Sequence, residues 1–282
     1  MEQSDSLAID KKKIPDITRY DGKYHALPIH GNDTALRSFK KQYSASQQHV
    51  ILALNRVDFN NFSSQDSLAV PDSVWEQLLS YTPFPPHIKA LEPVDKMVLF
   101  AYPIQAFSVY ENGYLVRWGP SSMGSKLHPT QTGLSFTNWK AEEHVSTADD
   151  EWILRWNFNI RNKEGIGWHE YTMPGYPASH SCLRLLENDA RWLYDWADEW
   201  IVEKDQHVLA EGTPVLVFGS YDYEGQKPWL KLIADPHAND LGEEELEAEI
   251  KPHLEQILQE QKKRAQVVSG QSSSGEEGEQ TP

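Results

Sequence analysis

Cysteine is almost absent from this sequence. Cys182 is the single cysteine in 282 residues, so no disulfide can form within the chain, and cysteine usage does not report the redox compartment. A lone thiol is commonly a small buried hydrophobe. It can also be a nucleophile, but only as the thiolate, which needs a neighbouring group to take its proton. The residues around Cys182 therefore decide between the two interpretations.

Basic residues are also scarce. The chain has 26 Lys and Arg against 42 Asp and Glu, a formal net charge of −16, which argues against a nucleic-acid partner because phosphates need a basic surface. No apolar run reaches the length of a transmembrane helix. The N-terminus, M-E-Q-S-D-S-L-A-I-D-K-K-K, has no apolar signal core. Either the protein is intracellular or an export signal has been removed, and the sequence leaves both interpretations open.

The stretch 169–185 carries two histidines ahead of the cysteine and reads H-E-Y-T-M-P-G-Y-P-A-S-H-S-C-L-R-L. His180 stands two positions before Cys182, and His169 stands thirteen positions before it. Two prolines and a glycine give the run a loop-like backbone. Polar side chains surround the thiol, which is unlike a core strand: Ser179, Ser181 and Arg184. This setting favours the nucleophile over the buried hydrophobe.

Three kinds of chemistry fit such a stretch. His169, His180 and Cys182 are all zinc-ligand types, but the peptidase pattern H-E-x-x-H that begins at His169 has Met173 in its fifth position. A serine enzyme would normally show a G-x-S-x-G turn, which the chain lacks. Covalent acyl transfer by Cys182, with a histidine as base, needs neither a metal nor an organic cofactor. We therefore expect no metal and no cofactor.

Residues 24–72 show the order strand, helix, helix, strand. Asp33 or Thr34 can cap the first helix, and apolar residues follow at helical spacing. The run from G-N-D-T-A-L-R-S-F-K-K to L-A-V-P resembles a LysM module, and such modules bind the N-acetylglucosamine chains of peptidoglycan or chitin. Gln65-Asp66 stands where that family commonly has a Gly-Gln or similar pair. A small helical cap packed on the next domain is the alternative.

From Met97 the apolar period changes to two, which predicts short strands joined by turns. Asn112-Gly113 is a strong hairpin signal between two of them. After the cysteine, Asn188 or Asp189 can cap a helix, whose tryptophans recur at spacing i, i+4, i+8 and are expected to pack on a sheet: Trp192, Trp196 and Trp200. The predicted class is α+β, a mainly-β sandwich with one packed helix after the cysteine.

Residues 97–233 resemble the catalytic domain of L,D-transpeptidases (YkuD type). The likeness rests on S-H-S-C-L-R-L with an upstream histidine and a downstream G-T-P-V strand. Q-A-F-S-V-Y-E-N-G-Y-L-V looks like the opening hairpin of that domain, and P-T-Q-T-G-L looks like its threonine-proline-x-glycine loop. All of these parts occur in the family's order.

The resemblance implies a role for each site residue. Cys182 would be the nucleophile, and His169 the general base and later the acid, oriented by a backbone carbonyl. Backbone N–H groups around Ser181 and Cys182 would form the oxyanion hole. His180 would orient the loop by hydrogen bonds and is the alternative base. Arg184 would hold the loop or a substrate carboxylate.

Two further substrate-binding candidates, Trp168 and Tyr171, flank His169 and Glu170. The sequence departs from the family pattern in two places. Ser181 stands where the family usually has glycine between the second histidine and the cysteine, so serine would be strained if that position needs a positive φ. Glu170 follows the first histidine, where glycine is usual. These departures bear on which substrate would be bound more than on the assignment of Cys182 as the nucleophile.

The resemblance also implies a function. The expected reaction is cross-linking of peptidoglycan stem peptides in the cell wall, with an L,D-carboxypeptidase, a non-catalytic glycan-binding envelope protein and a cytosolic cysteine hydrolase as alternatives. Carbapenem-type β-lactams are the expected inhibitors. Such substrates lie in the cell envelope or periplasm, so we expect the protein to be exported and its export signal to have been removed. A lipid anchor upstream of residue 1 is one way in which it could be attached.

The chain divides, on these patterns, into six parts. A flexible lead-in at 1–23 precedes the LysM-like segment at 24–72 and a connector at 73–96. The catalytic domain would span 97–235. A charged helical segment, interrupted by Pro252, would follow at 236–268, and the composition of 269–282 predicts a disordered tail.

Overall fold

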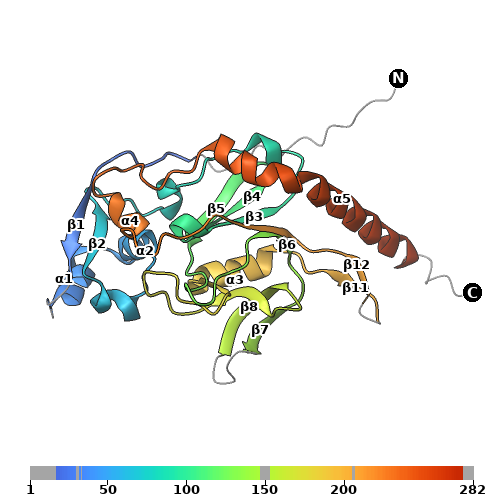
Figure 1. The fold of residues 1–282 in the computed structure, drawn as a ribbon, viewed down its shortest axis with the longest axis horizontal. Coiled ribbons are helices and arrows are strands. Elements are labelled where there is room, and N and C mark those ends of the chain that lie inside the picture. The colour runs from blue at the N-terminus through green and yellow to red at the C-terminus, as the bar shows by residue number, and fades with distance from the viewer. Residues whose placement is uncertain (1–16, 30–31, 33, 147–152, 205–206, 276–282) are drawn as a thin grey trace, which may run out of the picture.

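The fold is mixed α+β, as predicted, with sheets packed as a sandwich and helices around them (Figure 1). The computed structural model describes residues 17–29, 32, 34–146, 153–204 and 207–275. The expected lead-in up to residue 16 lies outside these ranges, as does Asp33. No helix in the described ranges has the length and apolar character needed to cross a bilayer.

The N-terminal segment has the predicted order of strand, helix, helix and strand. Strands β1 (Tyr24–Pro28) and β2 (Ser67–Pro71) pair antiparallel around helices α1 (Ala35–Gln42) and α2 (Ala45–Leu54). Thr34 is the N-cap of α1, although its side chain makes no capping hydrogen bond. Helix α2 begins with a capping box between Ser44 and Gln47, which satisfies two backbone N–H groups that a helix start leaves free. A 3₁₀ helix, η2 (Phe59–Ser64), joins α2 to β2.

This segment shares a hydrophobic core with the rest of the chain. Tyr24, Val50 and Leu54 belong to the same buried cluster as Leu99 and Trp118 of the following sheet. In the connector, only the short 3₁₀ helices η3 (Leu78–Tyr81) and η4 (Lys89–Leu91) form, because prolines at 83, 85 and 86 interrupt the backbone ladder between them.

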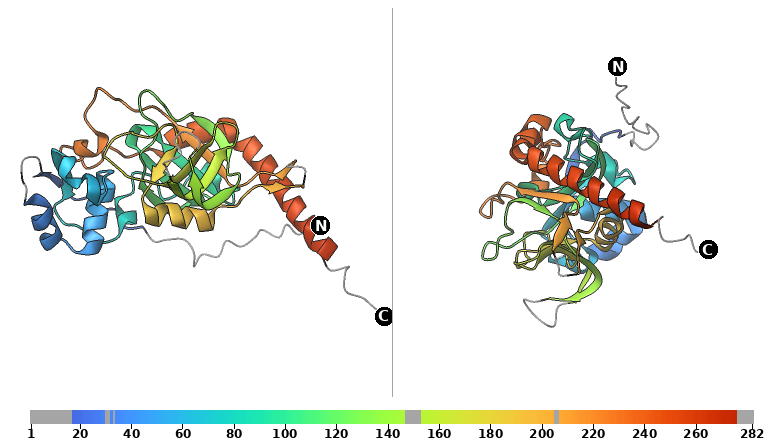
Figure 2. Two further views of the ribbon diagram at one scale, coloured as in Figure 1. Left: turned by 90° about the horizontal axis from the view of Figure 1, so that it is seen from below. Right: turned by 90° about the vertical axis from the view of Figure 1, so that its right-hand side faces the viewer.

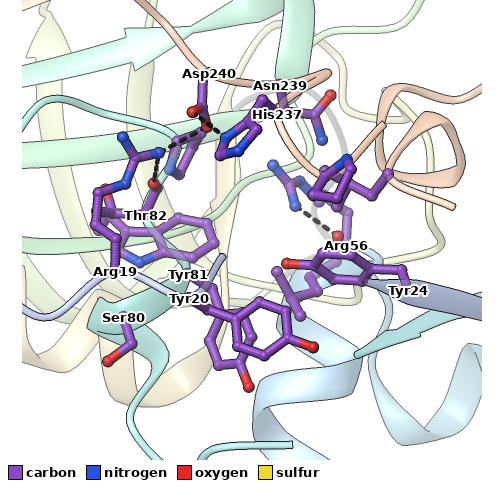
Figure 3. A pocket seen from close by; sticks show the side chains of 15 residues that line it. Arg19, Tyr20, Tyr24, Arg56, Ser80, Tyr81, Thr82, His237, Asn239 and Asp240 are labelled. Carbon is purple, nitrogen blue, oxygen red and sulfur yellow. Dashed lines mark hydrogen bonds and ion pairs between the residues drawn. The ribbon is translucent and has the colours of Figure 1, made fainter. Parts of the chain in front are cut away.

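Arg56 ties the end of α2 to the sheet part. Figure 3 shows this side chain in the pocket that it lines together with Tyr24. Its guanidinium is wholly buried and donates to the carbonyl oxygens of Leu54 at 2.6 Å, Ile104 at 3.0 Å and Gln105 at 3.2 Å. It lies over the rings of Trp118 and Trp229 at 5.8 and 5.3 Å. Burial lowers the pKa of Arg56 to about 9, which still leaves the guanidinium a cation at neutral pH.

The larger sheet has the order β5-β4-β3-β13-β6. Strands β3 (Met97–Ala101), β4 (Ala106–Glu111) and β5 (Tyr114–Pro120) form a meander, and β13 (Pro214–Phe218) lies parallel to β3 and antiparallel to β6 (Gly133–Phe136). The predicted hairpin is present at Asn112-Gly113. Both residues have positive φ, 47° and 83°, as the tight turn between twisted strands requires.

The second sheet has the order β10-β9-β8-β7 and carries the candidate site. Its strands are β7 (Lys140–Val145), β8 (Ile153–Arg161), β9 (Ile166–Glu170) and β10 (Leu183–Leu185). Apolar side chains from both sheets meet in one buried cluster, which includes Phe100, Phe107 and Phe158. A short ribbon, β11 (Ile201–Val202) with β12 (Val208–Ala210), extends beside it.

Helix α3 (Glu187–Trp196) packs on this second sheet, as predicted, but begins earlier than expected. Its N-cap is Leu186, and Asp189 points inward, where its buried carboxylate takes two hydrogen bonds from Arg117 at 2.6 and 2.9 Å. Asp189 thus forms an ion pair with Arg117 and does not cap the helix. Trp192 and Trp196 stack at 5.5 Å, whereas the third tryptophan of the stripe lies beyond the helix.

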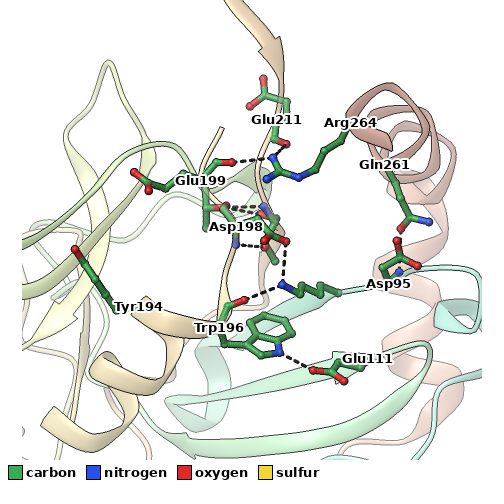
Figure 4. Close-up of polar contacts among 12 residues, drawn as sticks. Asp95, Glu111, Tyr194, Trp196, Asp198, Glu199, Glu211, Gln261 and Arg264 are labelled. Atoms are coloured by element: carbon green, nitrogen blue, oxygen red, sulfur yellow. Dashed lines mark hydrogen bonds and ion pairs between the residues drawn. The ribbon is translucent and has the colours of Figure 1, made fainter. Parts of the chain in front are cut away.

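The C-terminal helix α5 runs Glu243–Gly275 and extends well past the sheets (Figure 2). It follows the short α4 (Pro228–Lys231). Pro252 lies inside α5 without ending it. Leu246, Ile250 and Ile257 anchor the helix in the shared core, which offsets the roughly 3 kcal/mol that an interior proline costs. Arg264 donates to the carbonyl oxygens of residues 199 and 211 at 2.7 and 2.9 Å (Figure 4).

The end of α5 differs from the sequence prediction. Disorder was predicted from residue 269, but the helix continues through Gly275, because each further residue of a formed helix adds one hydrogen bond for the backbone it fixes. Residues 276–282 lie outside the described ranges.

The ion pair beneath α3 gives a stability prediction. We expect Arg117→Met to lower the free energy of unfolding by about 3 kcal/mol, because it leaves the carboxylate of Asp189 buried without its cation. Urea denaturation at pH 7 measures the change. Arg155→Met is the matched control, since its 3.8 Å pair with Glu187 is exposed and should contribute less than about 1 kcal/mol. Equal losses in the two variants would contradict the assignment.

Candidate active site

Parallel pairing of β9 with β10 brings the two ends of the predicted catalytic stretch together. Arg184 lies opposite His169 in the register, and Leu183 lies opposite Trp168. Side chains alternate between the faces of a strand, so Trp168 and Leu183 point into the core while His169 and Arg184 share the other face. Cys182 precedes Leu183 and lines the same cavity as His169 and Arg184.

That cavity has a volume of about 520 Å³ and opens to solvent. One wall is the β7–β8 hairpin, and the others are the loop that contains Pro129 and Gln131 and the loop that ends at Cys182. The remaining polar and aromatic lining includes Trp139, His144, Asn157, Asn159, Glu164, Tyr171 and Ser179. A cavity of this size and mixed character suits a peptide-sized substrate.

Trp168 does not contact this cavity, so its prediction as a substrate-binding residue is wrong. Its side chain is wholly buried and packs against Phe100 and Phe158 at ring distances of 6.2 and 5.2 Å. The reason is the period of two along β9: once His169 faces the cavity, its neighbour must face the core.

His169 is held by a backbone carbonyl, as expected. Its Nδ1 lies 2.8 Å from the carbonyl oxygen of Glu170. A carbonyl only accepts, so Nδ1 carries the proton and Nε2 is the acceptor nitrogen. Burial lowers the pKa of His169 to about 4, with Arg184 adding to the effect. The imidazole is therefore neutral at pH 7, in the tautomer that can accept a proton.

Cys182 lies in the same desolvated setting. Burial raises the pKa of its thiol, while a backbone hydrogen bond and the charge of Arg184 act in the opposite direction. The thiol and the imidazole are thus both neutral at rest, and the sulfur donates to the carbonyl oxygen of Gly165 at 3.9 Å. The sequence led us to expect ionisation of the sulfur by the imidazole, but burial favours the neutral form of both groups.

Thr130 fixes the peptide unit that precedes Cys182. Its hydroxyl donates to the carbonyl oxygen of Ser181 at 2.9 Å and accepts from the N–H of Gly124 at 2.8 Å. In a planar trans peptide the carbonyl and the following N–H point in opposite directions, so the N–H of Cys182 points away from Thr130. The hydroxyl of Ser179 holds the next carbonyl, that of Cys182, at 2.5 Å.

The sequence did not assign a role to Thr130, although the P-T-Q-T-G motif that contains it carried part of the family resemblance. Hydroxyls that orient backbone groups leave no pattern beyond the residue type. The same holds for Ser122, whose hydroxyl donates to the carbonyl oxygen of Tyr176 at 2.7 Å and accepts from the N–H of Ala178 at 3.2 Å.

Ser181 adopts φ = +87°, in the left-handed region. The sequence indicated strain there if this position needs a positive φ, and the structure shows that it does. Only glycine adopts such a conformation without steric cost. The Ser181 hydroxyl donates to the carbonyl oxygen of His128 at 3.3 Å, which offsets part of that cost.

His180 lies at the rim of the cavity. It is exposed, and its ring stacks on His128 with centroids 4.5 Å apart and planes 26° apart. It is not buried as His169 is. The geometry therefore favours His169 as the base, and the expected role of His180 in orienting the loop stays a prediction.

Arg184 and Tyr171 form one side of the cavity. The guanidinium carbon lies 4.6 Å from the centre of the Tyr171 ring, and Nη1 lies 3.4 Å from the carbonyl oxygen of Thr172. Burial lowers the pKa of Arg184, while Tyr171 acts to raise it. Stacking on an aromatic face leaves the edge of a guanidinium available to a carboxylate. Among the described residues, no three His, Cys, Asp or Glu side chains are grouped as metal ligands.

Part of the chain is similar to known proteins. Residues 98–217 match the family model of the L,D-transpeptidase catalytic domain, YkuD. The chain is therefore similar to the catalytic domain of L,D-transpeptidases over rather less than half of its length. The search of curated protein sequences finds no match.

Solved structures of L,D-transpeptidases are also similar. The enzyme from Stackebrandtia nassauensis is 26% identical over 45% of this chain, with a TM-score of 0.37, and the match spans only 57% of that protein. The enzyme from Xylanimonas cellulosilytica is 19% identical over 72% of this chain and 100% of its own, with a TM-score of 0.42. That from Mycobacterium smegmatis is 17% identical over 73% of this chain and 96% of its own, with a TM-score of 0.36.

The backbone at Ser181 gives a prediction for two substitutions. Ser181→Gly should raise the free energy of unfolding by about 1 kcal/mol, because glycine adopts φ = +87° without strain, and modification of Cys182 should persist. Ser181→Val should do the reverse, since a β-branched residue is an outlier at this φ. Thermal denaturation and the rate of thiol alkylation measure both. If Ser181→Gly were less stable than the native protein, the backbone at Ser181 would not be strained.

The buried imidazole predicts a pH dependence. An unfolded histidine takes up a proton near its ordinary pKa of 6.5, whereas the folded His169 does so near 4. The contribution of the neutral His169 to the free energy of unfolding is therefore fully present above about pH 6.5. It falls by about 3 kcal/mol as the pH decreases towards 4. We expect His169→Gln to remove this part of the acid destabilisation in urea denaturation series at pH 4 to 7. Parallel curves for the two proteins would exclude it.

Proposed function

We propose that this protein is a peptidoglycan L,D-transpeptidase that cross-links stem peptides during cell-wall biogenesis. The observation that carries the proposal is the shared cavity of Cys182 and His169, in which a backbone carbonyl presents the acceptor nitrogen of the imidazole. The match of residues 98–217 to the YkuD family model supports it.

The first half-reaction acylates the sulfur. As Cys182 attacks the carbonyl carbon of the third, L-configured residue of a tetrapeptide stem, its thiol proton passes to Nε2 of His169. Negative charge develops on the carbonyl oxygen, and the N–H groups of Ser181 and Cys182 are the candidates to stabilise it. The carbonyl of Ser181, held by Thr130, fixes the direction of the second of these donors.

The imidazolium then protonates the leaving amine, so D-alanine departs and a thioester remains. A neutral resting pair suits this step. Because His169 has a pKa of about 4, its protonated form gives up the proton readily to an amine. An amine from a neighbouring stem next attacks the thioester, loses its proton to His169 and releases the thiol, which makes a cross-link between third-position residues.

Arg184 is the proposed binding group for the substrate. A tetrapeptide stem ends in the carboxylate of its terminal D-alanine, one residue beyond the bond that breaks. Arg184 lines the same cavity from strand β10, which begins directly after Cys182, and its planar donor fork matches a carboxylate. Tyr171 supports the guanidinium by stacking.

Water in place of the amine would make the enzyme an L,D-carboxypeptidase. Both outcomes use the same site, and the acceptor alone separates them. The substrate also implies a location outside the cytoplasm, in the cell envelope. The β1–α1–α2–β2 segment is the proposed binder of glycan strands, on the strength of its LysM-like order.

The direct test is mass spectrometry of muropeptides after incubation with the purified full chain. We expect the native protein to release D-alanine from disaccharide-tetrapeptides and to form cross-linked dimers, and to gain a carbapenem adduct in intact mass. Cys182→Ala should lose all three signals, because no other thiol exists in the chain. His169→Ala should lose nearly as much as Cys182→Ala.

His180→Ala is the control, since this ring is exposed at the rim of the cavity and stacks on His128, and the variant should retain most of the activity. Release of D-alanine without dimers would assign the carboxypeptidase. Absence of every product from the native protein, with retention on isolated sacculi, would leave a glycan-binding protein instead.

A further inference from the structure

The N-terminal segment holds the loop that joins the histidine to the cysteine. Residues Thr172–Gly175 leave the end of β9 and run against the turn after α2. Val57 forms an isolated antiparallel bridge with Pro174. The N–H of Asp58 donates to the carbonyl oxygen of Met173 at 3.0 Å. We call the contacts between residues 57–65 and 172–175 the loop clamp.

Asp58 is the centre of the loop clamp. Its Oδ2 accepts from the N–H of Met173 at 2.7 Å and from the hydroxyl of Thr172 at 3.1 Å. Its Oδ1 instead accepts from the N–H of Asn61 at 2.9 Å, as the N-cap of η2. Asn61 adds a hydrogen bond from its amide to the Thr172 hydroxyl at 2.7 Å. One carboxylate thus joins two parts of the chain that lie more than a hundred residues apart.

Gln65 makes the second arm of the loop clamp. It is buried, with 4% of its surface exposed, and its Nε2 donates to the carbonyl oxygen of Pro174 at 3.0 Å. Its Oε1 accepts from Lys227 at 3.1 Å. Gly175 passes so close that a Cβ there would lie 2.8 Å from this Oε1, and its φ of +81° also requires glycine. The backbone therefore fits against the side chain with no room for another residue type.

The held segment begins three residues after His169 and continues into the cavity wall. The carbonyl oxygen of Thr172 takes the hydrogen bond from Arg184, and Tyr171 lies edge-on to the ring of His169 at 5.8 Å while it supports Arg184. A shift of the segment would move Tyr171 and Arg184 directly. It would also move the peptide of Glu170, whose carbonyl orients His169.

We propose that Asp58 and Gln65 are positioning residues for the reaction: they fix Thr172–Gly175 so that His169 and Arg184 keep their orientation towards Cys182. The inference rests on the proposed function. It makes the N-terminal segment part of the catalytic apparatus, in addition to any contact with glycan. Neither residue touches the cavity, so both act through the loop.

The substitution Asp58→Asn isolates the contact in the full-length chain. An asparagine retains one oxygen for the cap of η2 but replaces the other with an NH₂ group, which cannot accept from Met173. We expect the rate of acylation of Cys182 by a carbapenem to fall about tenfold or more, since misplacement of reacting groups costs rate steeply. The pH profile of Cys182 alkylation by iodoacetamide should also shift, because the oriented imidazole beside the thiol is disturbed.

Ser44→Ala is the matched control. It removes the capping box of α2 and a hydrogen bond to Glu76, so it weakens the same N-terminal segment without contact to the loop clamp. Its melting temperature should fall while acylation, measured well below the melting transition, stays at the native rate. Gln65→Met, which keeps the length of the side chain but not its amide, is the second test variant if Asp58→Asn does not fold.

The outcomes separate the two proposals. Native acylation rates and alkylation profiles in Asp58→Asn and Gln65→Met, with acylation intact in the native protein, would overturn the positioning role and leave the transpeptidase standing. If the native protein forms no carbapenem adduct, the proposed function fails, and the iodoacetamide profile alone then tests the positioning role. A profile that is shifted in Asp58→Asn but not in Ser44→Ala supports that role. An unshifted profile in Asp58→Asn refutes it.

Discussion

The parallel pairing of β9 with β10 is the constraint on which the site depends. A hairpin can join antiparallel neighbours in two residues, but parallel neighbours need a connection of about a dozen. The twelve residues 171–182 are that connection. This loop runs outside the sheet, so its backbone N–H and C=O groups have no partners in a strand ladder and need hydrogen bonds from other parts of the chain. Asp58 and Gln65 supply these partners on the outward part, and Ser122, Thr130 and Ser179 supply them on the return.

Burial decides the chemistry of the pair. Desolvation acts in opposite directions on an acid and a base: it raises the pKa of Cys182 and lowers that of His169. The two shifts reinforce one another, because each favours the neutral form. A thiol held in its neutral form reacts slowly with general electrophiles, so in the proposed reaction His169 would take the proton of Cys182 only as a bound carbonyl is attacked.

Much of the fold could be predicted from periodicity, but contacts between distant segments could not. The period of two and the Asn112-Gly113 turn predicted the meander, and helical spacing predicted α1, α2 and α3. The lone cysteine and the upstream histidine marked the site. The inward direction of Trp168 depends on the register of β9 with β10, which no local pattern records. Asp189 looked like a cap because its partner Arg117, which is only partly buried, stands 72 residues away in the chain. The carboxylate of Asp58 gave no signal, since its partners lie in another part of the fold.

The shared core has a consequence for modularity. Val50 and Leu54 before the family match, and Ile250 and Ile257 after it, fill the same apolar interior as the central strands. A recombinant fragment cut at the boundaries 98 and 217 would present that interior to water along one whole side of the sheet. The region that matches the family model is thus shorter than the part of the chain that folds together. If the flanking segments were exchanged for those of a relative, their buried faces would have to match the central strands.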